Sequence, residues 1–277
     1  MTTLITGATG AIGASLVRTL SSAGHTVRAG SRDPRRVTRS DAEVVELDLA
    51  APDTFDAALR NIDHVFLYAE PAAIGQFVES AQRAGVRRVV LLSSDSVAAV
   101  DPVSNALARH HADVEKALAG AAFGTTVLRP STFATMTLGW ASFVRADLPV
   151  EQAFWEARVD IIHPEDIADV AEIALAKDEF DGSIIPLGGP EKLRFHDYRQ
   201  VLASLLGREL NYREPSREQA VARLAEHVPA PLIDALLDYW EQFLRHDGDA
   251  SRSVERITGR PGRTFRQWAT EELASFR

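Results

Sequence analysis

Three glycines near the start of the chain have a spacing suited to binding a phosphate-containing ligand. Gly7, Gly10 and Gly13 directly follow a short apolar run and open a segment of helical period. At such a strand-to-helix turn, the first glycine permits a tight bend, the second lets the backbone approach a pyrophosphate, and the third lets helix and strand pack closely. The helix N-terminus adds N–H groups and partial positive charge. We predict dinucleotide binding here; the simpler interpretation is a glycine-rich turn without a ligand.

The end of the next predicted strand, Gly30-Ser31-Arg32, bears on which dinucleotide is bound. NAD sites usually place a carboxylate there for the ribose diol, whereas NADP sites place cations there for the 2′-phosphate. Arg32 can bind a phosphate in bidentate fashion, Ser31 can donate a hydrogen bond, and Arg35-Arg36 could assist. We predict NADP(H) as the cofactor. The alternative is that the arginines are only solvated and that Asp33 serves an NAD ribose.

Short β-branched runs alternate with longer amphipathic segments through the first half of the chain. The predicted strands are Thr2–Thr6, Thr26–Ser31, Glu43–Leu47, His64–Tyr68, Arg88–Ser93 and Thr125–Arg129. Between them, apolar residues such as Ile12, Leu16 and Leu20 recur at helical spacing. Repeated strand, helix, strand units form right-handed crossovers, so the pattern predicts a doubly wound parallel sheet covered on both faces.

The pattern changes after Arg129-Pro130. An aromatic-rich stretch leaves the sheet, a helix begins at Pro164, Ser183–Leu187 returns as a late strand, and the chain from Phe195 is mainly helical. We expect an α/β fold of Rossmann type with a smaller, mainly helical C-terminal lobe. The expected boundaries are a cofactor-binding core over residues 1–130 and a substrate lobe over residues 131–277, of which 160–190 rejoins the core sheet.

Composition excludes several classes of function. The 277 residues include no cysteine, which rules out disulfides, zinc–thiolate sites, iron–sulfur clusters and thiol nucleophiles. A formal charge of -9 disfavours nucleic acid and anionic membranes as partners. The N-terminus lacks the features of a secretory signal, and no apolar run is long enough to cross a membrane. We expect a cytoplasmic protein with a small-molecule substrate and no metal; the sequence does not indicate an oligomeric state.

The order of several motifs resembles the extended and atypical short-chain dehydrogenase/reductase superfamily, and within it the NmrA-like group, which includes NADPH-dependent quinone and triphenylmethane dye reductases. The resemblance covers nearly the whole chain. It is carried by Gly7–Gly13, Arg32–Pro34, Leu47–Leu49, Val65–Tyr68, Val86–Ser94, His111-x-x-x-Glu115, Leu128–Phe133, Pro164–Ala171 and Gly259–Phe265. Individually most of these motifs are weak.

The resemblance implies a set of cofactor contacts at the carboxyl ends of the predicted strands, where open α/β sheets bind ligands. Asp48 resembles the acidic residue that meets the adenine amino group, although it could equally cap a turn. Tyr68 and Ala69 fall where the family's chain passes the cofactor ribose, and Ser93 and Pro130 fall at the nicotinamide pocket. The complete expected set is Gly7, Thr9, Gly10, Ala11, Ile12, Gly13, Ser31, Arg32, Asp48, Leu49, Tyr68, Ala69, Ser93, Pro130 and Phe133.

The Tyr-x-x-x-Lys pair that orthodox short-chain reductases use to protonate an alkoxide is absent, and His111-x-x-x-Glu115 stands in its place. Helical spacing puts both side chains on one face, so Glu115 could orient or charge the imidazole. His111 could be a general acid, a substrate-positioning donor or a structural residue. A metal site with His110 is disfavoured because adjacent side chains point about 100° apart on a helix.

Loss of a general acid typically costs about 10² to 10⁴ in rate, which disfavours ordinary ketones. Acceptors that take hydride without simultaneous proton delivery fit better: quinones, iminium ions and enones. Aromatic residues could line a flat pocket for such substrates or simply form the core of the lobe. The candidate substrate residues are Ser131, Trp140, Phe143, Trp155 and Tyr239, and Ser94 is a candidate catalytic hydrogen-bond donor.

The expected function is that of an NADPH-dependent oxidoreductase transferring hydride to a small conjugated acceptor. A non-catalytic NAD(P)-binding redox sensor acting through a protein partner is the alternative, because the absent tyrosine and lysine are compatible with it. An epimerase or dehydratase ranks last, since it would normally need that tyrosine.

Overall fold

The computed structural model describes residues 1–37, 42–226, 228–245 and 249–277, and the chain forms two compact units. Unit 1 comprises residues 1–94, 109–129 and 164–186. Unit 2 comprises residues 95–108, 130–163 and 187–277. The chain passes between the units several times, so each unit is assembled from segments that are distant in sequence.

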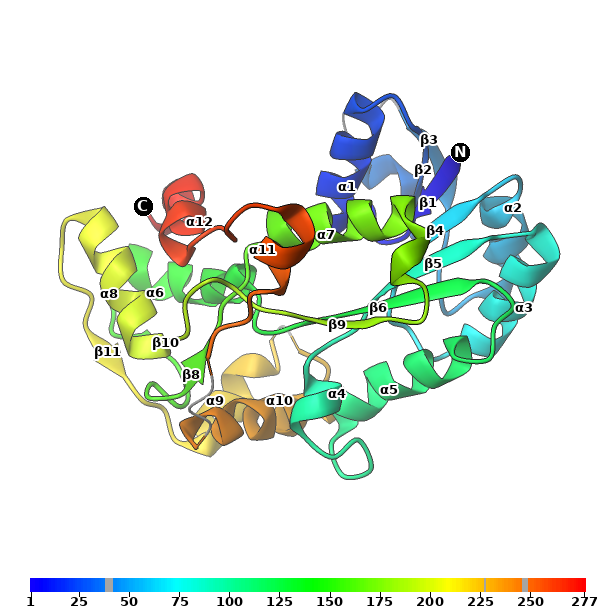
Figure 1. The fold of residues 1–277 in the computed structure, drawn as a ribbon. Coiled ribbons are helices and arrows are strands. Elements are labelled where there is room, and N and C mark those ends of the chain that lie inside the picture. Colours follow the sequence, from blue (N-terminus) through cyan, green and yellow to red (C-terminus); the bar gives the residue numbers. More distant parts are fainter. Residues whose placement is uncertain (38–41, 227, 246–248) are drawn as a thin grey trace. The chain divides into compact units, whose positions relative to one another are not determined.

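A seven-stranded sheet of order β3-β2-β1-β4-β5-β6-β9 forms the centre of unit 1 (Figure 1). Its strands are β1 (Thr2–Ile5), β2 (Thr26–Ser31), β3 (Glu43–Glu46), β4 (His64–Tyr68), β5 (Arg88–Leu92), β6 (Gly124–Pro130) and β9 (Ile184–Leu187). The pairs from β3 to β6 are parallel. The predicted doubly wound α/β sheet is confirmed, and the strand ends differ from the expected ones by at most one residue.

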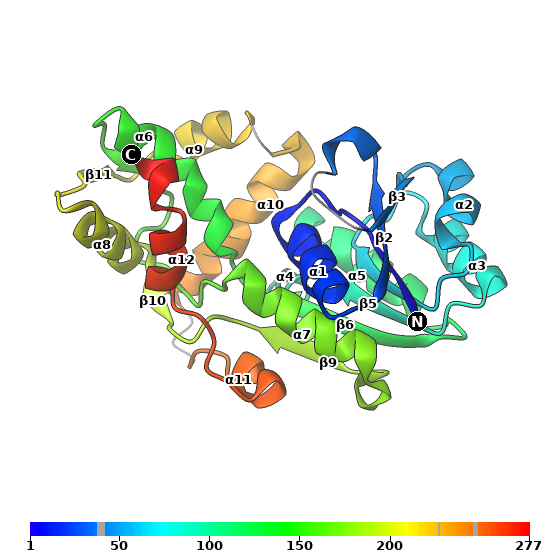
Figure 2. The ribbon, with the colours of Figure 1, turned by 90° about the horizontal axis from the view of Figure 1, so that it is seen from above.

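Continuous apolar runs explain why these strands are central. Val65, Phe66 and Leu67 in β4 and the whole of β5 are buried, as expected for strands covered on both faces. Figure 2 shows α1 (Ala11–Ser22) and α7 (Pro164–Ala176) on one face of the sheet. The other face carries α2 (Phe55–Leu59), α3 (Ile74–Ala84) and the unit 1 part of α5 (Ala106–Leu118). Short 3₁₀ turns cover Pro34–Arg36, Pro52–Thr54 and Asp178–Phe180.

Two ion pairs fasten the ends of these elements. Arg18 and the Ser15 hydroxyl both bind Glu165, at 2.7 and 2.8 Å, which joins α1 to α7. Arg88, buried in β5, binds Asp181 at 2.7 Å and donates to the Leu175 carbonyl oxygen. Pairing offsets the desolvation cost of this buried guanidinium, whereas removing its partner would leave an uncompensated charge.

Unit 2 is mainly helical. It contains α4 (Ser96–Ala99), α6 (Ala141–Arg145), α8 (Phe195–Leu206), α9 (Arg217–Leu224), α10 (Ala230–Glu241), α11 (Ser253–Thr258) and α12 (Phe265–Glu271), with 3₁₀ turns at Ala134–Trp140, Gln242–Leu244 and Leu273–Phe276. Two small sheets pair β8 (Arg158–Val159) with β10 (Leu193–Arg194) and β7 (Val150–Glu151) with β11 (Tyr212–Arg213).

Aromatic contacts build much of the core of unit 2. Trp140 packs on Trp155 with ring centroids 5.6 Å apart, and Phe195 meets Trp240 edge-on at 5.8 Å. The aromatic stretch after Phe133, which matches neither strand nor helix periodicity, therefore has a packing role. None of the helices among the described residues is long and apolar enough to cross a membrane.

Candidate functional site

The glycine-rich turn has the geometry that a pyrophosphate cradle needs. Gly7 adopts a φ of 61°, which side chains disfavour, and its carbonyl oxygen accepts from Gly10 N at 2.9 Å. A Cβ atom on Gly13 would lie 2.3 Å from that same oxygen, so only glycine permits this packing. Helix α1 starts directly afterwards and its N-cap, Gly10, supplies no side-chain cap, which leaves first-turn N–H groups for a ligand.

A cavity of about 640 Å³ lies against this turn, entirely within unit 1. Nine of the predicted cofactor residues line it: Gly7, Thr9, Gly10, Ser31, Arg32, Asp48, Leu49, Tyr68 and Ala69. Asp33 and Arg36, which the sequence analysis considered as alternative or assisting residues, also line it, and Thr6, Leu47 and Glu70 are lining residues that the expected cofactor set lacks. Each is next to a predicted one or close to a strand end, so the strand-end rule could have found them. Ala11, Ile12 and Gly13 are not among the lining residues, and Ile12 and Gly13 are buried in α1 packing.

Charges at the end of β2 favour a phosphate over a bare ribose diol. The Asp33 carboxylate binds Arg35 through both oxygens, with Nε to Oδ1 at 2.8 Å, and this contact lowers the pKa of Asp33. The Ser31 hydroxyl donates to the Asp33 carbonyl oxygen at 3.0 Å. Arg32 and Arg36 line the cavity. The carboxylate that an NAD ribose would need is thus already paired, and two guanidinium groups stand at the cavity wall.

Tyr68 closes the cavity beside the glycines. A Cβ atom on Gly7 would come within 2.8 Å of the Tyr68 ring, and burial raises the pKa of the Tyr68 phenol to about 12. The Tyr68 backbone N–H donates to the Thr6 hydroxyl at 2.8 Å. The Asp48 carboxylate accepts a hydrogen bond from Ala50 N at 3.0 Å and so caps this turn. Asp48 also lines the cavity.

Glu115 does not orient His111, contrary to the expectation from helical spacing. Its two oxygens accept from Arg129, at 3.0 Å from Nε and 2.6 Å from the terminal nitrogen, and it also accepts from the Ser93 hydroxyl. Arg129 and Glu115 are both largely buried, so this pair is a strong one. The Ser93 hydroxyl is therefore used in a hydrogen bond to Glu115 within unit 1. Ser94 follows it at the end of this segment.

His111 is a neutral, mostly buried imidazole. Burial, and secondarily the neighbouring His110, lowers the pKa of His111 to about 4, and its Nδ1 makes no hydrogen bond within the described chain. The His110 ring meets it edge-on at 5.2 Å, and His110 Nε2 lies 3.1 Å from the Ala69 carbonyl oxygen. His110, which sequence reasoning considered only as a metal ligand, therefore touches a cavity residue. Among the residues with assigned positions, no cluster of three acidic or histidine side chains could hold a metal ion.

The predicted substrate residues fall into two groups within unit 2. Trp140 and Phe143 line a cavity of about 190 Å³ together with Trp240. Trp155 packs behind Trp140 and donates its indole N–H to the Arg213 carbonyl oxygen at 3.1 Å. Of the five predicted substrate residues, only Trp140 and Phe143 are among the lining residues of this cavity.

Ser131 and Tyr239 belong to the second group. The Ser131 hydroxyl donates to the Asp160 carbonyl oxygen at 2.6 Å, and the Asp160 charge acts on Tyr239. Pro130 and Phe133 flank this segment, where the Pro130 carbonyl oxygen accepts from Asp95 N at 2.9 Å.

Comparisons with known proteins show which family this chain resembles. Residues 7–185 match the family model described as NAD(P)H-binding. The chain is 33% identical to a (4-alkanoyl-5-oxo-2,5-dihydrofuran-3-yl)methyl phosphate reductase of Streptomyces griseus, over 99% of this chain and 98% of that one. It is 29% identical to an NAD(P)H azoreductase of Xenophilus azovorans, with the same coverage. An NADPH-dependent quinone oxidoreductase from Escherichia coli, solved with NADPH, shares the fold with a TM-score of 0.79 at 19% identity, over 98% of this chain and 99% of that one.

Proposed function

The chain belongs to the NAD(P)H-binding family, within its NmrA-like reductases, and on that premise we propose that it is an NADPH-dependent oxidoreductase. Its substrate is a small conjugated carbonyl or related acceptor, to which it transfers hydride. The observation that carries the proposal is the unit 1 cavity, in which an uncapped glycine turn and two guanidinium groups meet. Arg32 and Arg36 would hold the 2′-phosphate, and the Gly7–Gly13 turn would hold the pyrophosphate.

The paired state of Asp33 supports NADPH over NADH. A carboxylate that hydrogen-bonds a ribose diol must have its oxygens available, and those of Asp33 are occupied by Arg35. The remaining guanidinium groups give charge-assisted hydrogen bonds to a phosphate, which are about twice as strong as neutral ones. Bound reduced nicotinamide would supply the hydride.

The protein's own groups contribute binding and orientation rather than strong acid catalysis. With a pKa of about 4, His111 is almost never an imidazolium at neutral pH, so it acts as a neutral polar group and not as a strong acid. Glu115 is held by Arg129 and is not available to charge it. Proximity of donor and acceptor in a site that excludes water is then the main source of rate.

The names of two relatives support a conjugated acceptor. The Streptomyces griseus relative acts on a dihydrofuran that carries an oxo and an alkanoyl group, and the Xenophilus azovorans relative is an azoreductase. Both kinds of molecule contain an electron-poor double bond that can accept hydride before protonation. Sequence identities of 33% and 29% over nearly the whole chain make such a substrate class the best supported one here.

The proposal is tested by following NADPH absorbance with purified protein and a panel of 2-cyclohexenone, quinones, an azo dye and an imine. We expect turnover on at least one conjugated acceptor and a clear preference for NADPH over NADH. Tight NADPH binding without turnover on any of them would contradict the enzyme and favour the redox-sensor alternative. Absence of binding would contradict both.

A further inference from the structure

Unit 2 contains a small cavity of its own with mostly apolar walls. Its volume is about 190 Å³, and the described residues that line it run from Met136 to Ala153 and from Pro215 to Trp240, both within unit 2. An apolar cavity of about 150 Å³ is large enough for benzene, so this one has room for a single substituted benzene ring. Its aromatic and aliphatic walls include Trp140, Phe143, Ala153, Ala220, Leu237 and Trp240.

One hydrogen-bond donor of the cavity wall is unused. Trp240 is 5% exposed, and its indole Nε1 has no hydrogen-bond partner within the described part of the chain. A buried tryptophan usually donates this N–H to an acceptor, because an unpaired buried donor costs free energy. Since Trp240 lines the cavity, an acceptor atom on a bound molecule can supply the missing partner.

The neighbouring polar groups already have partners. Trp140 Nε1 donates to Gln152 Oε1 at 3.1 Å, and Gln152 Nε2 donates to the Ala153 carbonyl oxygen at 3.0 Å. The Trp155 indole, which packs behind Trp140, also has an acceptor. Trp240 differs from these two tryptophans, so the hydrogen bond that a ligand would make here is to its indole N–H.

The charges near the cavity balance one another. The Glu151 carboxylate is buried, with 4% of its side chain exposed, and forms ion pairs with Arg213 and Arg223. The Arg223 guanidinium also lies 4.9 Å from the centre of the Phe143 ring. Glu226 is a further lining residue, so two carboxylates face two guanidinium groups. A neutral ligand therefore fits better than an ion, which would lose its hydration without a free counter-charge.

We propose that this cavity binds a small neutral aromatic molecule whose hydrogen-bond acceptor takes the Trp240 Nε1–H. The aromatic walls contact the ring of the ligand, and the indole fixes its orientation. An aryl ketone of about ten heavy atoms is a simple molecule of this class. The inference goes beyond the proposed reductase activity and does not depend on it, because unit 2 alone forms the site.

Two fluorinated probes of equal size test the site by ¹⁹F NMR titration of the full chain without cofactor. The first, 4-fluoroacetophenone, has a carbonyl acceptor, and the second, 1-fluoro-4-isopropylbenzene, replaces that carbonyl with a hydrocarbon group of similar shape. We expect the ketone to bind with a Kd of about 0.1 to 1 mM. Trp240→Phe removes the N–H, so it should weaken the ketone about 3- to 10-fold more than the hydrocarbon.

The indole N–H gives a direct signature of the hydrogen bond in the wild-type protein. In ¹H–¹⁵N spectra, the Trp240 Nε1–H signal should move downfield on addition of the ketone and much less on addition of the hydrocarbon. The signals of Trp140 and Trp155, whose N–H groups already have acceptors, should keep their hydrogen-bonded positions.

Ala220→Leu tests whether the probes occupy this cavity. Ala220 is buried in α9 and lines the cavity, so the larger side chain should fill it and weaken both probes at least about tenfold. Ala222→Leu is the matched control, because Ala222 is exposed on the same helix and is not a lining residue. It should leave both Kd values unchanged.

Three results would overturn the inference. The first is that neither probe binds up to its solubility limit. The second is that Ala220→Leu binds both probes as the wild type does, because the probes would then lie elsewhere. The third is that the Trp240 signal does not respond to the ketone and Trp240→Phe weakens both probes equally. If Trp240→Phe does not fold, the wild-type indole signal decides about the hydrogen bond and Ala220→Leu about the place.

Discussion

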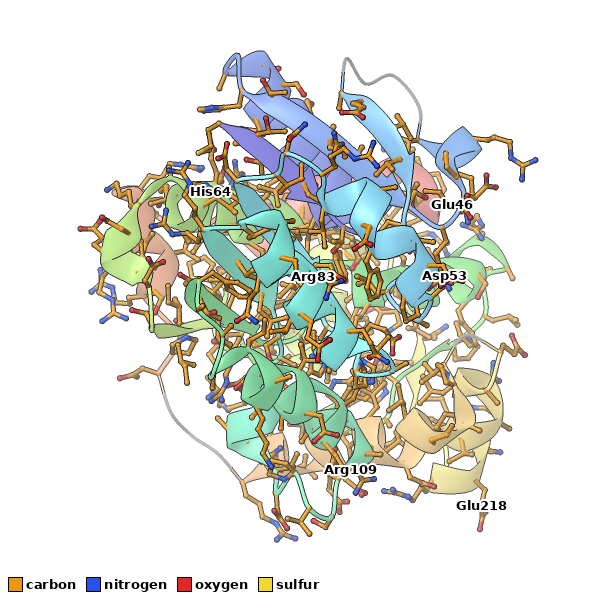
Figure 3. All side chains as sticks on the ribbon, turned by 90° about the vertical axis from the view of Figure 1, so that its right-hand side faces the viewer. Glu46, Asp53, His64, Arg83, Arg109 and Glu218 are labelled. Atoms are coloured by element: carbon orange, nitrogen blue, oxygen red, sulfur yellow. The ribbon has the colours of Figure 1, made fainter. Side chains whose placement is uncertain are left out.

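At the scale of single residues, cofactor choice depends on the arginines that follow β2. Arg32→Gln removes a guanidinium from the cavity wall, so the Kd of NADPH should rise about 10- to 100-fold while the Kd of NADH stays nearly constant. Fluorescence titration of both cofactors measures this. Arg83→Gln, on the surface of α3 (Figure 3), is the charge-matched control and should change neither Kd. Equal weakening of NADPH and NADH by Arg32→Gln would contradict phosphate recognition.

The buried His111 imidazole should make the stability of the fold depend on pH in the acidic range. Its pKa falls from an ordinary value of 6.5 to about 4 on folding, so the unfolded chain binds more protons between these two pH values. The stability that a neutral His111 contributes is present above pH 6.5 and is lost as the pH falls toward 4, by at most about 3 kcal/mol. The difference in melting temperature between wild type and His111→Gln should therefore change across this window.

Exposed His25 provides the comparison for that experiment, since His25→Gln should follow the wild-type pH dependence. If His111→Gln also follows it, the imidazole is not buried in its neutral form. A second readout is kcat/KM, which should show no His111 inflection between pH 5.5 and 8 because the ring is already neutral there.

The same residues show what the sequence could and could not predict about the site. The glycine turn and Arg32 were predicted from local spacing at strand ends and Asp48 from the family resemblance, and Gly7, Gly10, Arg32 and Asp48 all line the cavity. The partner of Glu115 was not found, because Arg129 is 14 residues away and only the sheet brings it to the helix. Helical spacing places His111 and Glu115 on one face, but a guanidinium competes for a carboxylate more strongly than an imidazole with a depressed pKa does.

At the scale of elements, we expect substitutions at two glycines of the turn from β1 into α1 to have different effects, one on stability and the other on NADPH binding. A Cβ atom on Gly13 would lie 2.3 Å from the Gly7 carbonyl oxygen, so Gly13→Ala should destabilise the fold by about 1–3 kcal/mol. A Cβ atom on Gly10 would meet its nearest atoms at 3.4 Å, which is ordinary contact. Gly10→Ala should keep its melting temperature and yet bind NADPH at least about tenfold more weakly, because the pyrophosphate must approach that backbone.

Calorimetry and titration of the two variants separate these effects. An unfolded Gly10→Ala variant would show that Gly10 serves packing, and unaltered NADPH affinity would show that the pyrophosphate lies elsewhere.

The order of elements was predictable because short β-branched or apolar strands alternate with helices that carry an apolar face, most clearly in β4 and β5. Strand ends were less predictable, since the last residue of a strand depends on its neighbour. The elements of unit 2 after Phe133 were predicted poorly. Their aromatic residues follow neither period, because a core of crossing short helices and two-residue strands imposes none.

At the scale of the whole molecule, the sequence analysis placed a single domain boundary between residues 130 and 131. Each of the two units instead combines segments from both sides of that boundary. Residues 95–108 lie in unit 2 although they follow β5, and residues 164–186 lie in unit 1 although they follow the aromatic stretch. Sequence reasoning anticipated the return of the later segment from its apolar pattern. The earlier excursion has no such signal, because a helix start after a strand looks the same in either unit.

The most direct measurement is reduction of 2-cyclohexenone with NADPH deuterated at C4, using each of the two C4 epimers in turn. The account predicts that one epimer delivers a single deuterium to the β-carbon of the cyclohexanone product. Product that carries no cofactor deuterium from either epimer, or cofactor that binds and is never oxidised, would contradict direct hydride transfer.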